Sequence, residues 1–113
     1  MNLQSEDVPG ARLITVGEPR IDASAAIQFK DKMRELTGDS PPRVILDLSQ
    51  VDFLDSSGLG AVVAAMKQLG PGRVLELCGL TKTVQKVFRL TRMDSVFVIH
   101  ENTDAALSHS AAS

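Results

Sequence analysis

Aromatic residues and cysteine are scarce in this sequence, which has no tryptophan, no tyrosine, four phenylalanines and one cysteine. A single cysteine, Cys78, cannot form an internal disulfide, and without paired Cys and His spacings it indicates no zinc site. We interpret Cys78 as a small buried apolar residue in a strand. So few aromatic side chains leave little material for stacking on nucleic-acid bases or on sugars.

An excess of charge of one sign is also lacking. The chain has 14 acidic and 12 basic residues, which give a formal net charge of -2. Proteins that bind nucleic acid need a basic surface, so we expect no nucleic-acid partner. The apolar runs are far shorter than the roughly 20 residues of a membrane span, and the mixed polar segment 1–6 is not typical of a signal peptide. The sequence therefore predicts a cytoplasmic protein with no membrane insertion.

The length of 113 residues indicates one domain, residues 1–113, with a single modest core. Its last residues, 108–113, are rich in serine and alanine, and we expect them to form a frayed tail. No internal repeat and no interdomain linker interrupts the chain. We therefore expect one small scaffold to carry the function.

The N-terminal half predicts a hairpin followed by an amphipathic helix. Pro9 and Gly10 are typical of a turn, and segment 11–16 alternates like a strand. Asp22 stands where an N-cap belongs, ahead of a helix that we expect from about Ala23 to Leu36. The residues that recur there at helical spacing are apolar: Ala26, Phe29, Met33 and Leu36.

The C-terminal half alternates strands and helices. Segment 43–48 is a nearly continuous apolar run, typical of a strand covered on both faces in a parallel sheet. A helical pattern follows from Gly58 to about Leu69, and segment 73–78 predicts the next strand. These three elements form a right-handed strand-helix-strand unit. We expect the remaining elements to be a helix from about residue 82, a strand over 96–99 and a short last helix through Leu107. The sum is about five mixed strands and four helices in one α/β layer sandwich.

The central feature of the sequence is the junction at residues 54–60 (LDSSGLG), where an apolar segment gives way to helix formers. Two hydroxyls, Ser56 and Ser57, stand beside the carboxyl of Asp55 at the predicted start of the helix. One serine could be an ordinary N-cap. Alternatively, a serine here could be phosphorylated, because a helix N-terminus tolerates the added charge of about -1.5 to -2. The residues alone favour neither interpretation.

The motifs of common enzyme classes are incomplete. A nucleophile elbow needs G-x-S-x-G, and no glycine precedes Ser56 or Ser57 at that spacing. The only histidines are His100, after a predicted strand, and His109, in the expected tail, where structural or solvated roles are favoured. Segment 58–60 (GLG) begins like a dinucleotide fingerprint but lacks the third glycine, and no Walker motif occurs.

Metal binding is not indicated either. Asp47, Asp52 and Asp55 are spaced across a strand and a loop in a way that matches no known ligand pattern. We therefore expect a protein that is not an enzyme and that has no metal and no cofactor of its own.

The residues around this junction resemble a known family. The run at 44–48 (VILDL) followed by 51–60 (VDFLDSSGLG) is similar to the signature of the STAS-domain anti-sigma factor antagonists, and the likeness extends over nearly the whole chain. The resemblance implies a STAS-like fold and a non-enzymatic binding protein whose phosphate acceptor is Ser56. It also implies that Asp22 lies near this acceptor. The partner-binding residues implied by the motif are Asp22, Asp55, Ser57, Gly58, Leu59 and Gly60.

The same resemblance implies a partner-switching cycle. Unphosphorylated protein would bind an anti-sigma factor that is also a serine kinase of the histidine-kinase-like ATPase fold, phosphorylation at Ser56 would end that binding, and a metal-dependent phosphatase would restore it. ATP and metal would belong to the partners. One departure is that the family's usual lead into the first helix is lengthened here by Pro19 and Arg20. This departure leaves open an alternative function, as a constitutive small subunit of a lipid-transport complex.

Overall fold

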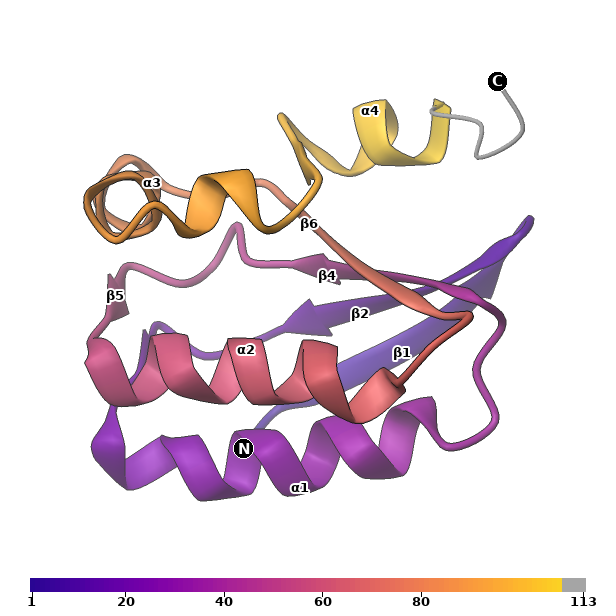
Figure 1. Ribbon diagram of the computed structural model, residues 1–113, viewed down its shortest axis with the longest axis horizontal. Helices are drawn as coiled ribbons and strands as arrows, with labels where there is room; N and C mark the ends of the chain where they lie inside the picture. Colours follow the sequence, from indigo (N-terminus) through magenta and orange to yellow (C-terminus); the bar gives the residue numbers. More distant parts are fainter. Residues whose placement is uncertain (109–113) are drawn as a thin grey trace.

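The structure is a computed structural model that describes residues 1–108 of the chain (Figure 1). Its elements follow in the order β1 (Leu3–Val8), β2 (Ala11–Val16), β3 (Arg20–Ile21), α1 (Ala23–Thr37), β4 (Arg43–Asp47), β5 (Phe53–Leu54), α2 (Ser56–Leu69), β6 (Val74–Cys78), α3 (Lys82–Leu90), a 3-10 turn (Met93–Ser95), β7 (Ile99–His100) and α4 (Thr103–Ser108). The expected α/β layer sandwich is confirmed. No helix among the described residues is both long and apolar enough to cross a membrane.

The main sheet has five strands in the order β1-β2-β4-β6-β7, and β3 pairs with β5 in a separate small sheet. The hairpin of β1 and β2 is antiparallel, whereas β2, β4, β6 and β7 run parallel. The central position of β4 explains its unbroken apolar run, because Val44, Ile45 and Leu46 are fully buried. The expected parallel pairing of segments 43–48 and 73–78 is thus confirmed as β4 with β6.

Helices cover both faces of the main sheet. α1 and α2 lie side by side on one face, where the apolar stripe of α1 buries Phe29 and Met33 (Figure 1). The short helix α4 covers part of the other face, and its Ala106 joins a smaller apolar cluster with Ile45 and Cys78. Cys78 is buried as expected, and this burial raises the pKa of its thiol.

The bounds of several predicted segments differ from the structure. The strand expected at 96–99 begins only at Ile99, because Arg92 adopts a left-handed conformation and a 3-10 turn uses residues 93–95. The carbonyl of Val98 nevertheless accepts a hydrogen bond from Leu77. The strand expected at 43–48 ends at Asp47. Of the expected tail, Ser108 is the last residue of α4, and residues 109–113, with His109, lie outside the described part of the chain.

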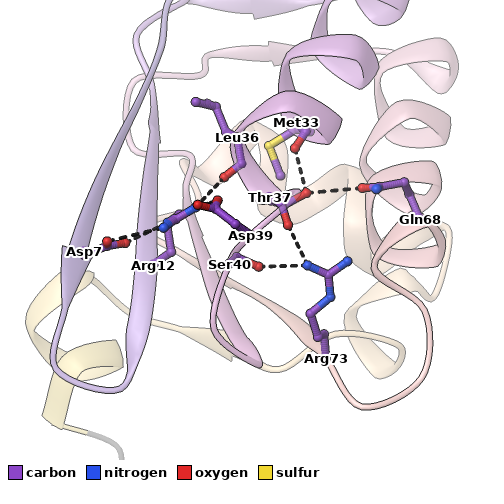
Figure 2. Close-up of polar contacts among 9 residues, drawn as sticks. All are labelled: Asp7, Arg12, Met33, Leu36, Thr37, Asp39, Ser40, Gln68 and Arg73. Atoms are coloured by element: carbon purple, nitrogen blue, oxygen red, sulfur yellow. Dashed lines mark hydrogen bonds and ion pairs between the residues drawn. The ribbon is translucent and has the colours of Figure 1, made fainter.

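Two arginines fasten the C-terminal end of α1 (Figure 2). Arg12, on β2, donates to the carbonyl of Leu36 and forms ion pairs of 2.7 Å with Asp7 and with Asp39. Arg73 donates to the carbonyl of Thr37. Helix C-termini leave carbonyl groups without helical partners, so these guanidinium groups satisfy acceptors that the helix cannot. Residues 54–60 lie near the opposite end of α1, where Asp22 stands.

Candidate functional site

The small sheet of β3 and β5 brings the starts of α1 and α2 together. Its two strands run parallel, with Arg20 opposite Phe53 and Ile21 opposite Leu54. The carbonyl of Pro19 extends this pairing by accepting hydrogen bonds from the backbone N–H groups of residues 52 and 53, at 2.8 and 3.1 Å. Each strand is followed by one aspartate and then by a helix. The lengthened lead with Pro19 and Arg20 is therefore an edge of this small sheet.

Asp22 is the N-cap of α1, as the sequence predicts. Its Oδ1 atom accepts hydrogen bonds from the backbone N–H groups of Ser24 and Ala25, at 3.1 and 3.3 Å, and from the Ser24 hydroxyl at 2.7 Å. The Ser24 hydroxyl, followed by Arg20, lowers the pKa of the Asp22 carboxyl below its ordinary value. A carboxylate at this position also suits the positive end of the helix dipole.

The N-cap of α2 is Asp55 and neither of the two serines. The Oδ1 atom of Asp55 accepts a hydrogen bond of 2.8 Å from the backbone N–H of Gly58. The alternative in which one of the two serines caps the helix is therefore wrong, and α2 begins at Ser56, two residues earlier than the apolar pattern indicates. Aspartate and serine are equally good N-caps, so composition alone does not decide between them.

Ser56 and Ser57 are the first two residues of α2, and both side chains are exposed. Within residues 1–108, neither hydroxyl makes a hydrogen bond to another residue. A serine that is not used as a cap keeps its Oγ atom available for chemistry. The site therefore separates two roles, with Asp55 capping the helix and a free hydroxyl beside it.

Gly58 allows α2 to approach β3 closely. A methyl group on Gly58 would overlap the carbonyl oxygen of Ile21, so no larger residue fits without movement of the backbone. Leu59 is buried in the main core, whereas Gly60 is exposed with open space around it. The signature thus divides into residues that hold the first turn of α2 in place and residues that form its surface.

Sequence reasoning missed a contact between Arg20 and Phe53. The Arg20 guanidinium lies 4.1 Å from the centroid of the Phe53 ring, and its Nε atom lies 3.4 Å from Oδ2 of Asp22. A signal for this contact was present, because Pro19 and Arg20 interrupt the usual lead into the first helix. Pairing of two-residue strands, however, leaves no periodicity in a sequence.

His100 belongs to a buried ionic cluster away from the serines. Glu76 accepts two hydrogen bonds of 2.8 Å from Arg43 and lies 2.7 Å from Nε2 of His100. Burial raises the pKa of Glu76, but the hydrogen bonds from Arg43 and His100 outweigh this effect and leave the pKa below its ordinary value. Arg43 also donates to the carbonyl of Ala106, which ties α4 to the sheet. Across the described residues, no group of three or more His, Cys, Asp or Glu side chains is arranged to hold a metal ion.

The sequence profile of the STAS domain matches residues 2–106, which carry this fold and the entire junction. The chain belongs to the STAS domain family. This confirms the resemblance seen in residues 44–60.

Among similar STAS proteins, the putative anti-sigma factor antagonist BtrV of Bordetella bronchiseptica is 29% identical over 107 residues, which are 94% of this chain and 91% of BtrV. The crystal structure of an anti-sigma factor antagonist from Mycobacterium paratuberculosis is 28% identical, with a TM-score of 0.84 over 95% of this chain and 91% of that one. The phosphorylated form of the Bacillus protein SpoIIAA, 21% identical, shares the fold with a TM-score of 0.67 over 94% and 96% of the two chains. The first two names describe a regulatory role, that of opposing an anti-sigma factor.

Proposed function

We propose that this STAS domain is an anti-sigma factor antagonist whose binding is ended by phosphorylation of Ser56. The observation that carries the proposal is the exposed, unbonded hydroxyl of Ser56 at the first position of α2, beside the cap carboxylate of Asp55. Relatives named as anti-sigma factor antagonists support the regulatory class. A relative in fold, SpoIIAA, has been studied in a phosphorylated form.

Phosphorylation at this position would change binding without unfolding the domain. A phosphoserine adds about -1.5 to -2 charges, and the start of a helix is the place in a fold that best accommodates negative charge. The carboxylates of Asp22 and Asp55 already lie at this end of the molecule. A partner that packs closely over the site, or that presents carboxylates to it, would be repelled by the added dianion.

The proposed docking surface consists of the exposed part of the signature. Ser56, Ser57 and Gly60 would contact the partner directly, flanked by Asp22 and Asp55. Gly58 and Leu59 would contribute from below, by fixing the first turn of α2 against β3. Ser56 and the six implied partner-binding residues would thus either line the docking surface or support it.

The proposed partner is an anti-sigma factor that is also a serine kinase of the histidine-kinase-like ATPase fold. It would supply the ATP, and a metal-dependent phosphatase would remove the phosphate from Ser56. The antagonist itself would then need to supply only the accessible hydroxyl of Ser56. A partner surface shaped around the unmodified serine both recognises the substrate and loses affinity for its product.

Phosphosite mapping after incubation with the cognate kinase and ATP tests this proposal. We expect one phosphate, on Ser56, because its hydroxyl is exposed and free. Ser56→Ala should abolish incorporation, and Ser57→Ala is the matched control that should keep it. A phosphate on another residue, or no phosphate at all, would contradict the proposal. Unmodified Ser56 in protein that is isolated with transport components would favour the constitutive-subunit alternative.

A further inference from the structure

Arg20 is held in a defined place at the edge of the small sheet. Its position opposite Phe53 follows from the parallel pairing of β3 with β5, and its guanidinium stacks 4.1 Å from the centre of the Phe53 ring. Stacking of this kind stabilises an exposed arginine and restricts its orientation. The side chain nevertheless remains 58% exposed, so its polar edge is open to solvent.

Most hydrogen-bond donors of Arg20 are uncommitted. Its Nε atom pairs with Asp22 at 3.4 Å, a long contact. Within the described residues, the two Nη groups of Arg20 make no hydrogen bond. A planar guanidinium with free amino groups matches the oxygens of a phosphate, to which arginine can donate two parallel hydrogen bonds.

The small sheet places β3, the strand that carries this arginine, beside the first turn of α2. Ser56 is three residues beyond Phe53, the ring on which Arg20 stacks. The backbone of Ile21, the neighbour of Arg20, lies directly against Gly58 in the same turn. A phosphate on Ser56 would therefore emerge next to the strand that carries Arg20, and it would carry more charge than the carboxylate of Asp22.

We propose that Arg20 is the residue that binds the phosphate of phosphorylated Ser56. Its guanidinium would exchange a weak contact with the Asp22 carboxylate for a stronger contact with the phosphate. This inference rests on the proposed function and adds to it a second structural change. The phosphate would be partly neutralised on one side, and Asp22 would lose the cation that now accompanies it. A partner would then meet a rearranged pair at residues 20 and 22 as well as a new dianion at residue 56.

The experiment uses the full chain with phosphoserine installed at position 56 during translation, so that it does not depend on any kinase. The second pKa of a phosphoserine is about 6, and ³¹P NMR titration measures it directly. A neighbouring cation lowers the pKa of an acid, so we expect Arg20→Gln to raise the phosphate pKa by about half a unit to one unit. Arg34→Gln, an equal loss of charge near the other end of α1, should leave it unchanged.

Two further variants distinguish hydrogen bonding by the positioned guanidinium from the effect of its positive charge alone. Arg20→Lys keeps the charge but removes the planar pair of donors, so the phosphate pKa should lie between those of the parent chain and Arg20→Gln. Phe53→Leu removes the ring that positions the guanidinium and should also raise the phosphate pKa. Equal phosphate pKa values in the parent chain and Arg20→Gln would overturn the inference. Failure of the kinase to modify Ser56 would instead overturn the proposed function, so the two failures are distinct.

Discussion

At the scale of single residues, Gly58 shows how the junction is built. Its position is fixed by the close approach of the Ile21 carbonyl, which leaves no room for a side chain. Gly60, two residues further along the same helix, has no such neighbour. The backbone contact therefore requires glycine at position 58 but not at position 60, and substitution by alanine can distinguish the two positions.

We expect Gly58→Ala to lower the free energy of unfolding by about 1–3 kcal/mol, because overpacking forces the start of α2 away from β3. The matched variant Gly60→Ala should raise it by about 0.5–1 kcal/mol, because alanine is the better helix former and meets open space. Denaturation by urea measures both. Equal effects of the two substitutions would contradict the close contact at Gly58.

The serines at this scale could be recognised from sequence, but their roles could not be fully assigned. Composition predicted that hydroxyls and a carboxylate meet at the start of a helix. It did not decide which of them caps, because aspartate and serine satisfy the same backbone N–H groups equally well. The structure assigns the cap to Asp55 and leaves both serine hydroxyls without a partner among the described residues.

At the scale of elements, the long periodic segments were predictable and the short paired ones were not. α1, β4 and β6 each carry a run of apolar residues whose spacing indicates its structure. β3 and β5 have two residues each, too few to show alternation, and they exist because they pair with one another. Arg20 was missed as a site residue for the same reason, since its contacts with Phe53 depend on that pairing.

The buried ion pair between Glu76 and Arg43, whose arginine also holds α4, gives a prediction at this scale. Glu76 has a pKa below the ordinary value of 4.5, so its charge stabilises the folded state above that pH. As the pH falls through the folded-state pKa, the carboxylate is protonated and this stabilisation is lost. Glu76→Gln should therefore be less stable at neutral pH, by about 3 kcal/mol, because it removes the carboxylate that accepts two hydrogen bonds from buried Arg43.

The variant should also lose less stability than the parent chain between neutral pH and pH values below 4.5. Chemical denaturation at a series of pH values measures this difference. Glu35→Gln is the matched control. Glu35 is exposed and forms a surface ion pair of 3.9 Å with Lys32, so its replacement should change stability by less than about 1 kcal/mol. Parallel pH profiles for Glu76→Gln and the parent would contradict the role assigned to this cluster.

At the scale of the whole molecule, the two ends of α1 differ, because side-chain hydrogen bonds hold its C-terminal end and the proposed binding surface lies at its N-terminal end. Arg12 and Arg73 satisfy the carbonyl groups at the C-terminal end of α1 (Figure 2). The starts of α1 and α2 meet at the other end, with the exposed serines between their caps. The sequence predicted the layers through their hydrophobic periods. It could not place the two ends, because these depend on side chains that reach across 24 to 36 residues of chain.

Affinity purification of the chain from its own cells, with phosphosite mapping of the bound and free fractions, is the sharpest test of a Ser56 phosphorylation switch. We expect that chains recovered with an anti-sigma factor kinase carry an unmodified Ser56 hydroxyl, and that chains phosphorylated at Ser56 are recovered without this kinase. Recovery of the partner with chains that are stoichiometrically phosphorylated at Ser56 would contradict the account.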